Sequence, residues 1–227
     1  MTDTSEDPGP REILEIRQRI LAWGLENYRA FPWRTPPSPF LGLIAEILLQ
    51  RTRAKNVVPV YEKFAAQYPT AEALARATPS AVEEMIRPLG LLWRAPLIHA
   101  LGTQLTDSDI PGDIDGLLQL PGVGPYVAAA FHSFHRGGRG VLIDSNVVRW
   151  LARLTGRPYD AETRRKRWVL ELADKITPAE NVREFNFALL DFTMTICAPR
   201  IPYCKDCPLG PDLCDYRRTT DLLPPLR

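Results

Sequence analysis

Four cysteines near the C-terminus have the residue type and the spacing of ligands. Cys197, Cys204, Cys207 and Cys214 follow the pattern C-x6-C-x2-C-x6-C and are the only cysteines among the 227 residues. Four thiolates in one short loop can surround a compact inorganic cluster, and [4Fe–4S] clusters use four such ligands. The spacing therefore predicts a [4Fe–4S] cluster in this segment.

Two other interpretations of the cysteines stay open. Structural zinc sites usually combine two C-x2-C pairs separated by a longer spacer, whereas only Cys204 and Cys207 form such a pair here. Unliganded core cysteines are the simplest alternative, although proline, lysine and aspartate lie between them. A disulfide scaffold would spread its bridges along the chain, so the clustering indicates a cofactor site in a reducing cytoplasm.

A glycine-rich turn is the second feature with a chemical use. The segment 120–124, LPGVG, joins two stretches of helical pattern, and Pro125 suits the first turn of a helix. Gly122 and Gly124 leave no side chain in the way, so amides at the start of the next helix can hold a phosphate oxygen without reading base sequence. A dinucleotide-binding turn does not fit, because no strand precedes it and Val127 occupies the third glycine position. An ordinary helix connection is the remaining alternative.

Two acidic residues lie at positions that could give them either a structural or a chemical role. Asp144 stands at the start of a predicted helix, where an aspartate taken alone is expected to be an N-cap. Glu46 lies in the otherwise apolar stretch 41–49, which a helix would bury. A buried carboxyl group tends to hold its proton, which suits a general acid or a hydrogen-bond donor to a leaving group. A structural ion pair with an arginine is the alternative for Glu46.

The elements that would position these residues are helices, which makes the predicted fold class all-α. No alternating strand pair and no internal repeat is evident. Ser80 and Glu83 are expected to form a capping box. The polar, acidic residues 1–10 are expected to be a short disordered lead rather than a secretory signal. Apolar residues recur at spacings of three and four over 13–23, 39–51, 54–67, 80–87, 92–105, 125–135, 144–154, 162–176 and 183–195.

The composition argues against a membrane span and against a bulk polycation. No stretch approaches the run of about 20 apolar residues that would cross a bilayer. The 28 Lys and Arg residues face 27 Asp and Glu, a net charge of +1. Binding to nucleic acid would therefore have to come from local basic patches.

In their order and spacing, these motifs resemble the helix-hairpin-helix DNA glycosylases, which include endonuclease III and the adenine and thymine mismatch glycosylases. The resemblance runs from FPWR at 31–34 through LPGVG and the segment VLIDSNVVR at 141–149 to the cysteines. It implies two helical domains that flank a DNA-binding cleft. These are a six-helix barrel over 33–137 with the hairpin, and a cluster domain made of 11–32 plus 138–218.

The resemblance also implies an active site. Asp144 matches the family's essential aspartate, where a carboxylate stabilises positive charge on the sugar and activates or replaces a water, and Asn146 is expected to help position it. Glu46 would then be the acid beside the departing base. Tyr126 resembles a base-pocket tyrosine of several mismatch glycosylases, with ordinary aromatic packing as the alternative. The endonuclease III branch has a nucleophilic lysine at this position. Without that amine no Schiff base can form, which predicts a monofunctional glycosylase.

The resemblance further indicates how the chain would contact DNA. A base must leave the stack before it can be excised, so protein side chains have to fill its place. Gln50 and Arg51 match the family's intercalating loop, and Leu92 and Trp93 lie in a second minor-groove loop; scattered surface residues are the alternative for both. The hairpin residues Gly122, Val123 and Gly124 would hold a phosphate. Further phosphate contacts could come from arginines that, taken singly, are expected to be solvated surface charges: Arg34, Arg94, Arg149, Arg200, Arg217 and Arg218.

The excised base is predicted from two segments. Residues 44–46 and 191–200 look more like the glycosylases that remove T or U opposite G than like the adenine-specific branch. That branch usually has an additional C-terminal domain, which we expect to be absent because the chain ends soon after Cys214. The sequence thus predicts a monomeric, cytoplasmic, nucleoid-associated glycosylase that acts on mismatched or damaged double-stranded DNA and has no membrane partner. The alternatives are an enzyme for adenine opposite G or 8-oxoguanine or for another damaged base, a non-catalytic DNA-binding module, and a redox protein.

Overall fold

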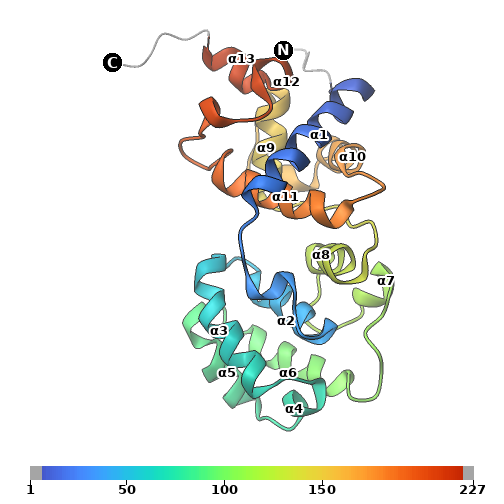
Figure 1. The fold of residues 1–227 in the computed structure, drawn as a ribbon. Coiled ribbons are helices and arrows are strands. Elements are labelled where there is room, and N and C mark those ends of the chain that lie inside the picture. The colour runs from blue at the N-terminus through green and yellow to red at the C-terminus, as the bar shows by residue number, and fades with distance from the viewer. Residues whose placement is uncertain (1–6, 222–227) are drawn as a thin grey trace. The chain divides into compact units, whose positions relative to one another are not determined.

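The protein is helical in a computed structural model that describes residues 7–221, and these residues contain no strand (Figure 1). The chain divides into two compact units. Ala30–Gly140 form one, called here the continuous unit. Met1–Arg29 and Val141–Arg227 form the other, called here the split unit. The all-α fold class is confirmed.

The continuous unit is built around one buried helix. Every residue of α2 (Pro39–Leu49) from Phe40 to Leu48 is buried, because its sequence is apolar on all sides. The Ser38 side chain caps this helix by accepting a hydrogen bond from the Leu41 amide. The helices around it are α3 (Ala54–Gln67), α4 (Ala71–Ala75), α5 (Pro79–Ile86), α6 (Arg94–Gln104), α7 (Ile114–Leu117) and α8 (Pro125–Arg136), with short turns η1 (Pro32–Arg34) and η2 (Arg87–Leu89).

The split unit is held together by the pairing of its first helix with a late one. In α1 (Pro10–Asn27), Gly24 lies against Ala188 of α11 (Val182–Thr195), and a Cβ on Gly24 would come within 3.0 Å of the Ala188 Cα. Two small residues at this crossing let the helix backbones approach closely. The remaining elements are α9 (Ser145–Thr155), η3 (Thr163–Arg165), α10 (Arg167–Ile176), η4 (Cys204–Asp206), α12 (Gly210–Leu213) and α13 (Asp215–Asp221).

Local side-chain bonding moves some helix ends away from their predicted places. The helices expected over 54–67 and 183–195 are confirmed to within one residue. The helix expected over 162–176 begins only at Arg167, because Asp160 and Thr163 hydrogen-bond to each other and form a separate turn. The predicted capping box of Ser80 and Glu83 is wrong. Pro79 occupies the first helical position of α5, so the cap is Thr78.

The predicted disordered lead is too long. Asp7 pairs with Arg157 at 2.7 Å and with Lys175 at 3.1 Å, and Pro10 begins α1. The rest of the predicted lead, residues 1–6, lies outside the described residues. Within residues 7–221 no helix combines the length and the apolar character needed to cross a bilayer.

The crossing of α1 and α11 can be tested by adding one methyl group. Gly24→Ala should lower the free energy of unfolding by about 1–2 kcal/mol, even though alanine favours a helix by about 1 kcal/mol over glycine. Urea denaturation measures the change. Gly112→Ala is the control, because a Cβ there meets nothing within 4 Å. A Gly24→Ala protein as stable as the wild type would contradict the close packing.

Candidate active site and cysteine pocket

Asp144 is held in one orientation at the start of α9. Its Oδ1 accepts hydrogen bonds from the amides of Asn146 at 2.9 Å and Val147 at 2.7 Å, so the predicted N-cap is confirmed. Its Oδ2 accepts a third bond from the Asn146 side chain at 2.7 Å. The carboxylate is half-buried. An acid fixed by three donors is pre-oriented for a reaction at one place.

A chain of hydrogen bonds runs from Asp144 to the cysteine segment. Asn146 Oδ1 accepts from Arg149 Nη1 at 3.0 Å. The Arg149 guanidinium donates to the Cys197 carbonyl from Nε at 3.1 Å and from Nη2 at 2.9 Å, and to the Thr193 carbonyl at 2.6 Å. Arg149 is only 5% exposed, so its proposed role as a phosphate contact is wrong. It instead connects the candidate catalytic acid to the loop of the candidate ligands.

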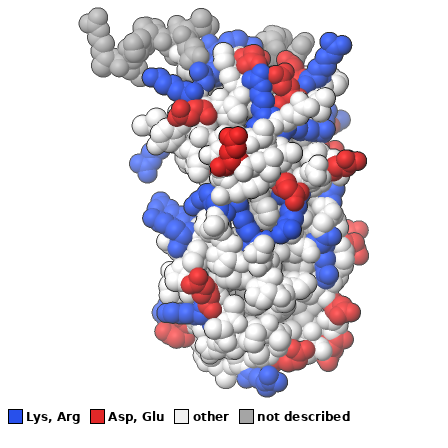
Figure 2. All heavy atoms as spheres, viewed as in Figure 1, with Lys and Arg blue, Asp and Glu red and all other residues white. Residues whose placement is uncertain are grey.

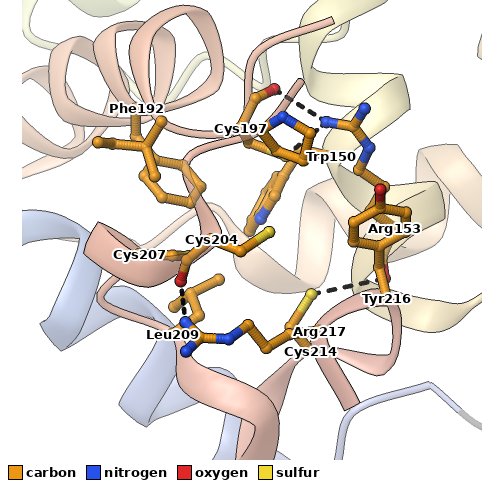
Figure 3. A pocket seen from close by; sticks show the side chains of 12 residues that line it. Trp150, Arg153, Phe192, Cys197, Cys204, Cys207, Leu209, Cys214, Tyr216 and Arg217 are labelled. Atoms are coloured by element: carbon orange, nitrogen blue, oxygen red, sulfur yellow. Dashed lines mark hydrogen bonds between the residues drawn. The ribbon is translucent and has the colours of Figure 1, made fainter. Parts of the chain in front are cut away.

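The four cysteines line a single cavity (Figure 3). None of them forms a disulfide. Arg153 Nη1 donates to Cys197 Sγ at 3.4 Å, and Cys214 Sγ donates to the Arg153 carbonyl at 3.6 Å. The apolar side chains that line the same cavity include Trp150, Phe192 and Leu209.

Burial governs the chemistry of these thiols. It raises the pKa of Cys207, and it raises the pKa of Cys214 to about 12. Both groups are therefore neutral thiols in the free protein, and binding to a metal as thiolates would release protons. Among the described residues, no three His, Cys, Asp or Glu side chains are arranged as the ligands of a single metal ion. Four thiols around one cavity do fit the donor set of an iron–sulfur cluster.

Glu46 is buried in α2, as its apolar surroundings predicted, with 3% of its surface exposed. Its ionisable neighbour is a histidine and not an arginine. Glu46 Oε1 lies 3.5 Å from Nε2 of His135 in α8. Glu46 and His135 thus form a pair of ionisable side chains from two helices, α2 and α8, that pack against each other.

The hairpin forms a helix, a tight turn and a second helix. Gly122 has a φ of 77°, which L-residues rarely adopt. Gly124 precedes α8, whose first turn receives no side-chain cap, and a Cβ on Gly124 would meet nothing within 4 Å. Val123 is buried, so the turn presents backbone rather than its side chain. Tyr126 lies half-buried in the first turn of α8.

The hairpin and the loop after α2 are joined directly. Gln50 Nε2 donates to the Gly122 carbonyl at 3.0 Å. Arg51, the next residue, is exposed and has a φ of 56°, a strained value for a residue with a side chain. In the predicted intercalating loop, Gln50 is therefore anchored to the hairpin, and Arg51 is exposed with a strained backbone.

Arg94 holds the second predicted DNA-contacting loop to the first. It is 2% exposed, so its assignment as a phosphate contact is wrong. Its guanidinium donates to the carbonyl of Leu91 at 3.4 Å and to that of Gln50 at 3.3 Å. Leu92 packs against the core, whereas Trp93 is 57% exposed. Of the two residues predicted in this loop, only Trp93 presents most of its side chain to solvent.

The other candidate arginines differ in their surroundings. Arg217 donates to the Cys204 carbonyl, and Arg218 pairs with Asp215. Arg34 lies 5.6 Å from the centre of the Phe31 ring, and Arg200 is exposed. On the face shown in Figure 2, Lys and Arg side chains lie among Asp and Glu over both units, with wide uncharged areas between them.

Comparison with known proteins assigns a family. The family model for the HhH-GPD superfamily base excision DNA repair protein matches residues 44–173, which include Glu46, the hairpin and Asp144. The chain belongs to the HhH-GPD superfamily. It is 34% identical over 201 residues to the thymine/uracil-DNA glycosylase of Methanothermobacter thermautotrophicus, covering 87% of this chain and 90% of that protein.

Two further relatives of this HhH-GPD protein are informative. An adenine DNA glycosylase of Mycobacterium tuberculosis is 34% identical over 214 residues, covering 92% of this chain and 69% of that protein. The solved structure of a thermostable thymine-DNA glycosylase matches with a TM-score of 0.84 and 32% identity, covering 92% of this chain and 98% of that one.

Three residues of this HhH-GPD protein make buried contacts that the sequence analysis did not predict. Arg149 lies three residues after Asn146, so helical spacing could have put the two side chains together. Arg94 and His135 find their partners in elements distant in sequence. No local pattern marks such contacts.

The link through Arg149 predicts a large loss of stability. Arg149→Met would leave the buried Thr193 carbonyl without its donor and the Cys197 carbonyl with Arg153 alone, at an expected cost of about 2–4 kcal/mol. Thermal or urea unfolding measures this cost. Arg165→Met is the matched control, because the Arg165 side chain is 70% exposed and pairs only with Glu162. Equal stabilities of the two variants would refute the structural role of Arg149.

Proposed function

We propose that this chain is a monofunctional DNA glycosylase that removes thymine or uracil opposite guanine from duplex DNA. The observation that carries the proposal is the Asp144 carboxylate, fixed by three hydrogen bonds in a member of a base-excision repair family. The similarity to a thymine/uracil-DNA glycosylase and to a thymine-DNA glycosylase, each matched over most of its length, supports the choice of base. We expect a monomer that acts in the cytoplasm and associates with the nucleoid.

Asp144 is the group proposed to act on the sugar. A carboxylate has about four lone-pair sites, and the three hydrogen bonds leave one free on Oδ2. When the N-glycosidic bond breaks, its electron pair leaves with the base, and the carboxylate stabilises the positive charge on the deoxyribose. Oδ2 then takes a proton from the water whose oxygen bonds to C1′. The products are the free base and an abasic sugar.

Glu46 is the group proposed to act on the base. The Glu46 carboxyl group, which is 3% exposed, would donate its proton to the departing base. The base leaves with the electron pair of the broken bond and this proton. The proton that Asp144 receives from water balances the reaction.

Tyr126 supports the absence of strand cleavage. A phenol cannot form a Schiff base with the opened sugar, so the lysine-dependent lyase route is closed at this position. We infer that the Tyr126 ring helps to enclose the extruded nucleotide.

Backbone amides and two loops are proposed to hold the DNA. The uncapped start of α8 at Gly124 offers donors to a phosphate oxygen. Trp93 has the exposed apolar surface needed to fill the place of an extruded base, and Gln50 and Arg51 would reach the same region of the duplex. These contacts predict binding that weakens as the salt concentration rises.

We also propose that Cys197, Cys204, Cys207 and Cys214 bind a [4Fe–4S] cluster. The supporting observation is that four undisulfided thiols line one largely apolar cavity. Such a cluster supplies a redox-active centre that also cross-links its loop. The residues of this chain would do the rest: Arg153 donates to one ligand sulfur, and Arg149 connects the Cys197 backbone to Asn146.

Excision of adenine opposite guanine or 8-oxoguanine is the second candidate function. It is favoured by the 34% identity to an adenine DNA glycosylase, which equals the identity to the thymine/uracil enzyme. Only substrate tests distinguish the two.

The reaction is tested with end-labelled duplexes that carry T:G, U:G, A:G or A:8-oxoguanine. Strand breaks should appear in T:G and U:G, and only after alkali, because base release leaves an uncut abasic site. Asp144→Asn should lower the single-turnover rate by at least about 100-fold while duplex affinity stays within about threefold.

Several outcomes of this test would count against the proposal. Breaks without alkali, or a covalent complex trapped by borohydride, would show an amine nucleophile. Breaks confined to the adenine duplexes would favour the second candidate. Duplex binding without breaks in any substrate would favour a DNA-binding module. Ser108→Ala, an exposed change in the loop after α6, is the control and should leave the rate unchanged.

The cofactor is tested by metal analysis of anaerobically purified protein. About four iron and four sulfide per chain are expected, together with broad visible absorption, whereas about one zinc per chain would contradict the proposal. Cys204→Ala should lower the iron content. Tyr203→Ala, a change of the exposed neighbouring residue, should retain it.

A further inference from the structure

A buried histidine faces the carboxyl group of Glu46. The His135 and Glu46 side chains are 3% and 4% exposed, and Nε2 lies 3.5 Å from Oε1. Within the described residues Nε2 makes no hydrogen bond. A buried polar nitrogen without a partner costs about 1–3 kcal/mol. The pair is therefore a feature that packing alone does not favour.

The ring of His135 is confined to this position by α2 itself. Gly42 lies one helical turn before Glu46, and a Cβ on Gly42 would come within 2.7 Å of His135 Nδ1. Only a glycine leaves room for the imidazole to lie on α2. The rings of Phe131 and Phe134 lie 5.4 Å and 6.3 Å away, measured between ring centres. Apolar neighbours thus surround a ring whose Nε2 edge is directed at Glu46.

We propose that His135 is a positioning residue for Glu46 in base excision. The Nε2 edge of the imidazole faces Oε1 across 3.5 Å, so that Oε2 is left as the oxygen that gives its proton to the departing base. Once that proton has left, the carboxylate is negative, and an N–H at Nε2 can close on Oε1 as a charge-assisted hydrogen bond. The interaction is stronger after proton transfer than before it, which is how a fixed donor accelerates a step. This inference rests on the proposed function of Glu46.

Two amide substitutions test the geometry without removing polarity. The amide of His135→Gln can occupy the place of Nε2, whereas the shorter His135→Asn ends near the place of Nδ1 and cannot reach Oε1. The single-turnover excision rate should stay within about threefold of wild type for His135→Gln and fall by roughly tenfold for His135→Asn. Duplex affinity should be unchanged in both. Equal rates of the two variants would overturn the inference.

A double-mutant cycle separates positioning from packing. His135→Phe keeps a ring but has no donor, and it should slow excision by roughly tenfold in the wild-type background and by less than about twofold in Glu46→Gln. An equal effect in both backgrounds would overturn the inference, because it would mark a packing role. His132→Phe is the matched control on the same helix, since His132 bonds only to the Gly112 carbonyl, and it should leave the rate unchanged.

The cycle also distinguishes a failure of this inference from a failure of the proposed function. Glu46→Gln that excises at the wild-type rate would remove the proposed role of Glu46, and the role of His135 with it. A slow Glu46→Gln protein beside a fast His135→Phe protein would overturn only the role of His135.

Discussion

The three hydrogen bonds to the Asp144 carboxylate are the constraint on which the account of this protein depends. Two of the donors are backbone amides of α9, so the acid is in place whenever that helix is formed. The third, the Asn146 side chain, is itself held by Arg149, which binds the Cys197 carbonyl. The candidate catalytic acid and the cysteine segment are therefore parts of one hydrogen-bonded structure. Disorder in the cysteine segment would reach the acid through Arg149.

In the continuous unit, α2 connects a candidate catalytic acid to the hairpin. It carries Glu46 in its buried centre and ends at Gln50, whose side chain bonds to the hairpin. Arg94 accounts for a further constraint, because its guanidinium satisfies the last carbonyls of α2 and also binds Leu91. A buried arginine at the end of this helix thus fixes the end of α2 and the two loops predicted to contact DNA relative to one another.

Local patterns predicted the long helices and the contact of Asp144 with Asn146, although they misplaced the cap of α5. They could not predict contacts between residues distant in sequence. Apolar periodicity located the long helices, and the spacing of Asp144 and Asn146 on one helix start made their contact foreseeable. Arginine side chains usually lie at the surface, so the burial of Arg94 and Arg149 was not expected. Both are buried because their guanidinium groups bind backbone carbonyls of segments distant in sequence. The pairing of Glu46 with His135 depends on the packing of α2 on α8, and the sequence pattern gave no role to Gly42, the glycine that permits this pairing.

We propose above that the lone pair of Asp144 Oδ2 that accepts no hydrogen bond faces the sugar of an extruded nucleotide. A crystal structure of the wild-type protein with a duplex containing 2′-fluoro-thymidine opposite guanine, a substrate that binds and resists hydrolysis, tests it most directly. We expect the thymidine to be unstacked, with its C1′ or a bound water about 3–3.5 Å from Asp144 Oδ2. An extruded nucleotide held away from Asp144, or a thymidine still stacked in the duplex, would contradict the account.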